Sequence, residues 1–269
     1  RIKRFLSEVK QSVTPMTIWK YSEVGHSQDA KQNLKKLFDG KSFFDYPKSV
    51  ELIKRCIQLY SNESSIILDF FSGSATTAHA VMQLNAEDGG KRKFIMVQLP
   101  EKTDEKSEAF KAGYKNICEI GKERIRRAGE KIKEEAGLNG QDLDIGFRVL
   151  KLDSSNMKDI YYSADEYDQG MLENMQSNTK EDRTDLDLLF GCLVDWGLEL
   201  DKPYTTKVIN GHKVHIYNDG DLVACFENDL DMKTIDEIAK LQALRVVFCD
   251  NSFVDSATKI NVAEHFKMI

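Results

Sequence analysis

Apolar and polar positions in the first half of the chain form short apolar runs separated by stretches with helical spacing. The run at residues 66–68 ends at Asp69, which is typical of a strand buried on both faces of a parallel sheet. A turn of small residues at 72–75 separates it from residues 78–84, where apolar side chains recur with the period of a helix. A strand, a tight turn and a helix form the opening of a nucleotide-binding βα unit.

The same pattern predicts further elements on both sides of this unit. We expect helices over residues 27–38, 47–60, 104–137, 186–198, 235–244 and 262–266, and strands over 93–99, 146–152, 207–209, 214–217, 222–226 and 245–249. Ser27 is expected to cap the first helix, and Pro47 to lie at the start of the second. Asn210-Gly211 predicts a hairpin turn. The βαβαβ order up to residue 152 predicts a doubly wound parallel sheet with right-handed crossovers.

An acidic stretch separates this sheet from the rest of the chain. Residues 153–201 contain 13 acidic and 3 basic residues, and residues 163–182 show no clear apolar pattern. Such a composition favours a linker or an extended surface arm. We therefore predict three parts: a first domain over 1–152, an acidic arm over 153–182 and a small α+β domain over 183–269.

The composition adds limits to this picture. The 269 residues are 41% hydrophobic and 30% charged, and the sequence shows no signal peptide and no apolar run long enough to span a membrane. The five cysteines lack metal-binding spacing, and His212 and His215 should point to opposite faces of a strand. We expect a cytoplasmic protein without membrane contact or metal site. Because the chain starts at Arg1, we also expect it to be a piece of a longer polypeptide.

Charge is divided unevenly between the two halves. Residues 1–150 carry a net charge of +5 and residues 151–269 a net charge of −11. The first half is therefore the better suited to face a polyanion. The long helix also carries a run of basic residues, which we expect on its solvated sides, with DNA contact as the alternative. These residues are Lys122, Arg124, Arg126 and Arg127.

The turn after the first strand excludes two common phosphate-binding loops. No Gly-x-x-x-x-Gly-Lys-[Ser/Thr] occurs, and the dinucleotide fingerprint is broken because Gly73 is followed by Ala75 and Ala78. The turn instead resembles the first motif of S-adenosylmethionine-dependent amino-methyltransferases that act on DNA, whose usual form has glycine in place of Ala75. The resemblance implies that cofactor-binding residues include Asp69, Phe70, Phe71, Ser72, Gly73, Ser74, Thr76 and Thr77.

A second motif lies about twenty residues before the strand. Phe44, Pro47 and Lys48 match the Phe-x-x-Pro-Lys-Pro of the same family, with Ser49 in place of the second proline. In that family the motif packs over the methionine end of the cofactor. The resemblance therefore implies cofactor contacts from Phe44, Asp45, Tyr46, Pro47 and Lys48, and we expect this segment to lie against the turn at residues 71–77.

The end of the second strand should carry the residue that reaches the cofactor ribose. This residue is usually acidic, whereas the position here holds Gln98. A glutamine amide can still form a hydrogen bond with a hydroxyl group, as donor or acceptor. We therefore add Gln98 to the expected cofactor-binding residues.

Taken together, these motifs resemble the modification (Mod) subunit of type III restriction–modification systems. The strand predicted at 146–152, the Ser155-Asn156 pair and the acidic C-terminal part are similar to that subunit too. The resemblance implies a class I, Rossmann-like methyltransferase sheet, incomplete in this chain. It also implies transfer of a methyl group from S-adenosylmethionine to adenine N6 in double-stranded DNA, by base flipping. The implied assembly is a homodimer, with or without a restriction (Res) subunit.

One family motif is absent. Members of the family catalyse with Asp-Pro-Pro-Tyr, but this chain has four prolines and no two are adjacent. We therefore expect the chain to represent the C-terminal portion of such a subunit, with much of the cofactor site and no catalytic residue. Two alternatives remain open: a non-catalytic S-adenosylmethionine-binding or assembly module, and a nicotinamide-dependent oxidoreductase. The broken glycine fingerprint and the amide at Gln98 disfavour the oxidoreductase.

Overall fold

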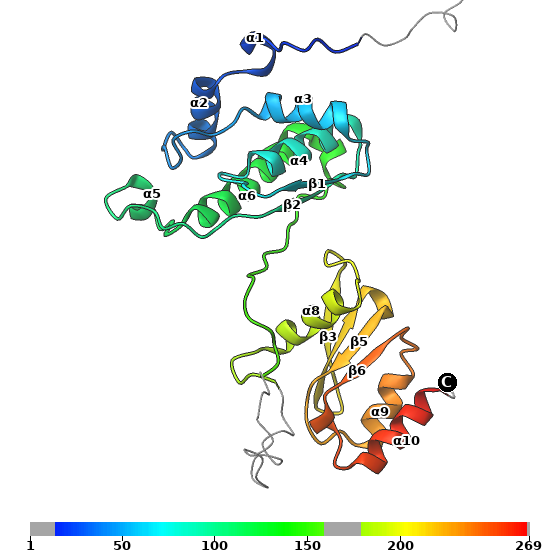
Figure 1. Ribbon diagram of the computed structural model, residues 1–269. Helices are drawn as coiled ribbons and strands as arrows, with labels where there is room; N and C mark the ends of the chain where they lie inside the picture. The colour runs from blue at the N-terminus through cyan, green and yellow to red at the C-terminus, as the bar shows by residue number, and fades with distance from the viewer. Residues whose placement is uncertain (1–13, 159–178, 268–269) are drawn as a thin grey trace, which may run out of the picture. The chain divides into compact units, whose positions relative to one another are not determined.

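The computed structural model describes residues 14–158 and 179–267, which form two compact units, Arg1–Gly146 and Phe147–Ile269 (Figure 1). Residues 147–152, assigned from the sequence to the first domain, belong to the second unit. Most of the predicted acidic arm lies outside the described residues. Within the described part of the chain, no helix is both long and apolar enough to cross a membrane.

The first unit is built from helices around a small parallel sheet. In chain order its elements are α1 (Tyr21–Val24), α2 (Ser27–Leu37), α3 (Val50–Tyr60), β1 (Ile66–Asp69), α4 (Thr76–Asp88), β2 (Lys93–Met96), α5 (Glu108–Lys111), α6 (Ile117–Ala136) and the 3-10 turn η2 (Gly137–Gly140). The strands, α4 and the flanking helices α2 and α3 agree with the sequence pattern to within a few residues. The chain is thus an α/β protein with small sheets.

The core of this unit lies on one face of the sheet. β1 and β2 pair in parallel, with Leu68 opposite Ile95, and α4 connects them. Ile67 and Phe94 point from the strands toward a buried cluster on α3 and α4. Helices α3 and α6 both pack against α4. This arrangement fixes where β1 ends, and therefore where the following turn lies.

The opposite face of this sheet is not covered by any described residue, so the prediction that β1 is buried on both faces was wrong. Ile66 is 62% exposed, and Leu68 and Ile95 are each 50% exposed. A parallel sheet normally carries helices on both faces because its strands are apolar on both. Here only the strand residues on the inner face, Ile67 and Phe94, pack against described helices.

The predicted third strand at 146–152 does not form. The segment is extended but pairs with no strand in the part of the chain that the structure describes, and Leu152 is 98% exposed. A strand gains stability from its hydrogen-bonded neighbours, and this segment finds none. Its Arg148 instead donates to the carbonyl oxygens of Leu200 and Lys202, within the second unit.

Two predictions about where helices begin in the first unit also need correction. Ser27 is the first helical residue and His26 is the cap, since its Nδ1 accepts from the Asp29 amide at 3.1 Å. Pro47 is buried but precedes the helix, because Ser49 occupies the N-cap of α3.

The predicted long helix at 104–137 is divided into α5 and α6. Gly113 has a φ of +97°, which an α-helix cannot accommodate. Asn116 then caps α6, its side chain accepting from the Glu119 amide at 3.1 Å. The break matters for the site below, because α6 begins beside the end of β2.

The second unit has a four-stranded sheet with helices on both faces (Figure 1). Its elements are α8 (Asp185–Asp195), β3 (Tyr204–Ile209), β4 (His212–Tyr217), η4 (Asn218–Gly220), β5 (Leu222–Cys225), α9 (Met232–Ala239), β6 (Val246–Phe248), η5 (Asp250–Ser252) and α10 (Ser256–Lys267). The strand order is β3-β4-β5-β6, antiparallel except for the parallel pair β5 and β6. The predicted hairpin forms, with positive φ at both Asn210 and Gly211.

Two separate clusters hold this second sheet. α8 buries Leu189 and Leu193 against Tyr217 on one face. α9 buries Ile235 and Ile238 on the other face, where α10 also packs. Both faces of this sheet are therefore covered by described helices.

Candidate cofactor site

Asp69, the last residue of β1, ties the strand to the beginning of α4. One oxygen of its carboxylate accepts from the Phe71 amide at 3.2 Å, and the other accepts from the Thr77 hydroxyl at 2.6 Å. Thr77 is buried, so this second bond is shielded from water. Asp69, the acidic residue of the motif, thus links the end of β1 to both ends of the turn.

The turn itself requires two left-handed residues. Gly73 has a φ of +50°, and Ala75, the N-cap of α4, has φ +59° and ψ +42°. An L-residue in this conformation costs about 1–2 kcal/mol, whereas glycine adopts it freely. Ala75 is buried, and its amide donates to the Ser72 carbonyl oxygen at 2.7 Å. The position where the family motif usually has glycine therefore does demand glycine-like geometry.

Gln98 holds the turn from the side of β2. Its Oε1 accepts from the Gly73 amide at 2.7 Å, and its Nε2 donates to the Leu99 carbonyl oxygen at 3.2 Å. Cys118 of α6 donates from Sγ to the Gln98 carbonyl oxygen at 3.4 Å. Both ends of the Gln98 amide are engaged in this arrangement, and its contact with a ribose stays a prediction.

The segment with the second motif contacts the turn through Phe44. A Cβ atom added to Gly73 would lie 3.3 Å from Cζ of Phe44, so the ring packs directly on the glycine. Tyr46 and Lys48 are exposed, and Asp45 forms an ion pair with Lys31 at 2.8 Å. The two motifs meet at Phe44 and Gly73.

Two aromatic rings stand exposed at the end of β1. Phe70 is 63% exposed and Phe71 is 89% exposed. Exposed rings of this size next to a strained turn are typical of a surface that contacts a flat ligand or another protein segment. Ser72 lies between this pair and Gly73, and its amide donates to the Val97 carbonyl oxygen at 3.2 Å.

Helix α6 contributes two residues that the sequence pattern did not assign to the site. Gly121 lies against the turn, since a Cβ there would be 3.4 Å from the Gly73 carbonyl oxygen. Arg124 is only 3% exposed, and its Nη1 donates to Ser74 and Thr76. The prediction that Arg124 lies on a solvated side of the helix was therefore wrong. The available signal was its position three residues after Gly121, on the stripe of small and apolar residues.

Burial changes the proton affinity of two groups beside the turn. It lowers the pKa of Arg124 to about 10, so the guanidinium still carries its charge at neutral pH. Burial, followed by the charges of Arg124, Lys131 and Lys54, lowers the pKa of His79 to about 3. The imidazole next to α6 is therefore neutral at physiological pH.

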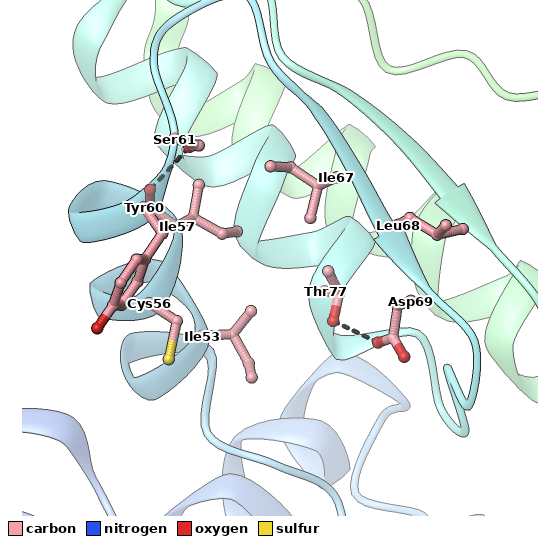
Figure 2. Close-up of a pocket in the computed structure, with 9 residues that line it drawn as sticks. All are labelled: Ile53, Cys56, Ile57, Tyr60, Ser61, Ile67, Leu68, Asp69 and Thr77. Atoms are coloured by element: carbon pink, nitrogen blue, oxygen red, sulfur yellow. Dashed lines mark hydrogen bonds between the residues drawn. The ribbon is translucent and has the colours of Figure 1, made fainter.

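A pocket of about 290 Å³ opens beside the turn, between α3 and β1 (Figure 2). Asp69 and Thr77 belong to both the pocket and the turn. The other lining residues are largely apolar and come from α3, its C-terminal end and β1: Ile53, Cys56, Ile57, Tyr60, Ser61, Ile67 and Leu68. Figure 2 shows Thr77 and Asp69 hydrogen-bonded at one end of the pocket, and Ser61 bonded to α3 at the other.

Comparison with known proteins identifies the first unit. Residues 2–130 match the model of the family described as DNA methylase. Over these residues, just under half of the chain, the sequence is similar to that family. The Mod subunit of the type III restriction–modification enzyme StyLTI from Salmonella typhimurium is 41% identical over 128 residues, which are 48% of this chain and 19% of that protein.

Other relatives extend the match. The EcoP15I Mod subunit from Escherichia coli is 30% identical over 245 residues, which are 88% of this chain and 36% of that protein. The type II methyltransferase M.KpnI from Klebsiella pneumoniae is 34% identical over 119 residues, or 44% of this chain and 28% of that protein. The chain thus resembles type III Mod subunits and a type II methyltransferase, and it spans between 19% and 36% of the length of these relatives.

Proposed function

We propose that this chain carries the S-adenosylmethionine-binding part of a site-specific DNA adenine-N6 methyltransferase of a restriction–modification system. The observation that carries the proposal is the turn from Asp69 to Thr77, with left-handed Gly73 packed against Phe44. The names of the relatives, type III Mod subunits and a type II methyltransferase, support the reaction class.

In this proposal the residues of the two motifs contact different parts of the cofactor. Phe44 to Lys48 would hold the methionine end of the cofactor, and the exposed ammonium of Lys48 would be available to its carboxylate. Phe70 and Phe71 offer rings to the adenine, and Asp69, Ser72, Ser74, Thr76 and Thr77 shape the turn between these contacts. Gln98 would form a hydrogen bond with the ribose. The bound cofactor supplies an activated methyl group on its sulfonium sulfur.

The fold we propose is the class I, doubly wound methyltransferase sheet, incomplete in this chain. A parallel pair of strands joined by a helix is its repeating unit, and β1, α4 and β2 form one such unit. The uncovered apolar face of that sheet supports the idea that further strands and helices complete it. Relatives that are several times longer have the additional polypeptide to do so.

Partners and catalysis belong to the complete subunit in this proposal. It acts on double-stranded DNA, flips the target adenine out of the duplex and works as a homodimer, with a Res subunit as a further partner. The 269 residues contain no Asp-Pro-Pro-Tyr, so no residue of this chain holds the adenine amino group. Orientation of the reacting groups lowers such barriers by about 7–11 kcal/mol in well-arranged cases. The chain alone should therefore transfer no methyl group to plasmid DNA.

Calorimetric titration of residues 1–269 tests the binding site directly. We expect S-adenosylmethionine to bind and NAD not to bind, which also separates the proposal from an oxidoreductase. Gly73→Val should abolish binding, because a branched side chain would meet the Phe44 ring and strain a positive φ. Gly197→Val is the matched control, since Gly197 has a φ of +63° but open space around it in the second unit. Equal binding by the Gly73→Val variant and the unsubstituted chain would contradict the assignment.

The activity test uses tritiated methyl transfer to plasmid DNA. The chain by itself should give background counts with saturating cofactor, and a longer polypeptide that contains Asp-Pro-Pro-Tyr should label the DNA. Methylation by residues 1–269 alone would mean that the division of the site is wrong.

A further inference from the structure

Helix α6 packs directly against the cofactor turn. A Cβ atom on Gly121 would lie 3.4 Å from the Gly73 carbonyl oxygen and 3.5 Å from Cβ of Ala75. These are van der Waals distances, so the helix backbone at Gly121 lies directly against the turn. Arg124 lies one helical turn further along α6, on the same face as Gly121.

A single nitrogen of Arg124 serves both residues that flank Ala75. Its Nη1 lies 2.9 Å from Oγ of Ser74, 3.3 Å from the Ser74 carbonyl oxygen and 2.7 Å from Oγ1 of Thr76. Ala75 lies between these anchors in the left-handed conformation, which it would not favour on its own. The guanidinium therefore opposes relaxation of the turn from both sides.

Burial of the Arg124 charge costs free energy, and a residue that served only to fill space would not need to carry a charge. No carboxylate of a described residue pairs with Arg124, and its Nε has no hydrogen-bond partner among the described residues. The charge also lies at the N-terminal end of α4, where the helix dipole disfavours a cation. An apolar side chain would pack under the turn without burying an unpaired charge. The hydrogen bonds to the turn are what the arginine adds.

We propose that Arg124 is a positioning residue of the cofactor site, which keeps Ala75 left-handed and so maintains the turn that binds S-adenosylmethionine. This inference rests on the proposed function for its ligand, but it makes a separate statement about the turn. Arg124 acts through Ser74 and Thr76 rather than by touching the ligand. Arg124 also links α6, which begins only at Ile117, to the turn that ends at Thr77.

The binding test compares Arg124→Met with Arg126→Met in residues 1–269. Methionine preserves much of the length and apolar volume in both cases. Arg126 is on the same helix, but its side chain is half-exposed and pairs with Glu123 at 3.6 Å. Arg124→Met should weaken S-adenosylmethionine binding roughly ten- to hundredfold, the range for losing hydrogen bonds to a charged group. Arg126→Met should bind like the unsubstituted chain. Equal affinities of both variants would overturn the inference.

Coupling to the anchors distinguishes positioning from general destabilisation. In a chain that already carries Ser74→Ala and Thr76→Val, Arg124→Met should cause much less additional loss of affinity. A purely structural role through packing would give the same additional loss in both backgrounds, and that result would overturn the inference.

A nuclear magnetic resonance measurement tests the turn without any ligand. A residue with positive φ gives a strong nuclear Overhauser effect between its own amide and Cα protons, because the two approach closely. Ala75 should show this signal in the unsubstituted chain and lose it in Arg124→Met, with Asn210 of the hairpin as an internal reference of positive φ. If Arg124→Met does not fold, Arg124→Lys serves instead, with a weakened signal expected.

The two readouts separate failure of the inference from failure of the proposed function. If the unsubstituted chain does not bind S-adenosylmethionine but Arg124 still controls the Ala75 signal, the proposed function is wrong and the role of Arg124 stands. If the chain binds the cofactor and the Ala75 signal is unchanged in both Arg124 variants, the inference is overturned.

Discussion

The two sheets of the molecule differ in how they are covered. The sheet of the second unit has α8 on one face and α9 and α10 on the other, and its central strand β5 is fully buried. Among the described residues, the sheet of the first unit has two strands and helices on one face only. Its outer face presents Ile66, Leu68 and Ile95 to solvent.

The difference separates a sheet with both faces buried from one whose outer face is exposed among the described residues. Apolar residues gain stability from removal of surface from water, about 25 cal/mol per Å², and half-exposed ones gain correspondingly less. The first unit compensates through helix packing around α4, which leaves the outer face free. The following predictions test this contrast, beginning with the largest effect.

The strongest test compares two leucines. Leu189→Ala in the second unit should lower the free energy of unfolding by about 2–5 kcal/mol, because Leu189 is fully buried. Leu68→Ala on the outer face of the first sheet should cost less than about 1 kcal/mol. Urea unfolding, monitored through amide hydrogen exchange in each unit, measures the change in the free energy of unfolding for both variants. Similar costs for the two would contradict the proposed contrast.

The next prediction concerns pH and applies to the first unit. His79 has a pKa of about 3 in the folded protein instead of its usual 6.5, so between these values only the unfolded chain takes up the proton. The contribution of the neutral imidazole to the free energy of unfolding therefore has its full value above about pH 6.5. As the pH decreases below that value, the free energy of unfolding falls by about 1.4 kcal/mol per pH unit. The loss should reach about 2 kcal/mol near pH 5.

His79→Gln provides the control for this titration. Glutamine is neutral at every pH in the range, so the variant should lose less stability between about pH 7 and pH 5 than the unsubstituted chain. Urea unfolding at the two pH values gives the comparison. An identical pH dependence in both proteins would assign it to other groups.

A smaller effect is expected at the turn. Ala75→Gly should stabilise the first unit by about 0.5–1 kcal/mol, because glycine relieves the left-handed strain but adds freedom to the unfolded chain. Ala86→Gly in the same helix, where no positive φ is needed, should destabilise instead. Thermal unfolding of the two variants should therefore shift in opposite directions. Destabilisation by both would show that the Ala75 methyl contributes more through packing than it costs in strain.

The smallest effect sharpens the contrast between chain and complete subunit. Ile95→Lys should change the stability of residues 1–269 by no more than about 0.5 kcal/mol, like Leu244→Lys at an exposed position of the second unit. In a full-length subunit the same Ile95→Lys should be strongly destabilising, if further helices cover the outer face as we propose. Unfolding of both lengths provides the measurement, and equal small effects in the two would refute that covering.

The local pattern around β1 and α4 was enough to predict the strand, the turn and the helix. Asp69, Gly73 and Thr77 follow one another within nine residues, and the hydrogen bonds of Asp69 are local. Gly73 also contacts Gln98 and Phe44, which are distant in the sequence. The contact of Phe44 with Gly73 also followed from the spacing of the two motifs. Cofactor contacts of these residues stay predictions until a ligand is titrated.

Features that depend on distant partners were not predicted. A charged residue in a basic helix normally faces solvent. The position of Arg124 beside Gly121 on the apolar stripe of α6 indicates burial, but it does not identify the acceptors fifty residues earlier. The segment 146–152 has a strand's composition, but a strand forms only where a neighbouring strand is available. Gly113 and Asn116 carried a local signal for the break between α5 and α6, which the apolar stripe concealed.

The hydrogen bond from Cys118 to the Gln98 carbonyl oxygen gives the protein a natural reporter of the site. Burial raises the pKa of the Cys118 thiol, so little reactive thiolate exists at neutral pH while α6 is seated beside the end of β2. Movement of α6 away from that strand would free the sulfur and accelerate its alkylation. Thiol labelling at Cys118, which is half-buried while this bond is formed, should therefore become faster when α6 moves away from the end of β2.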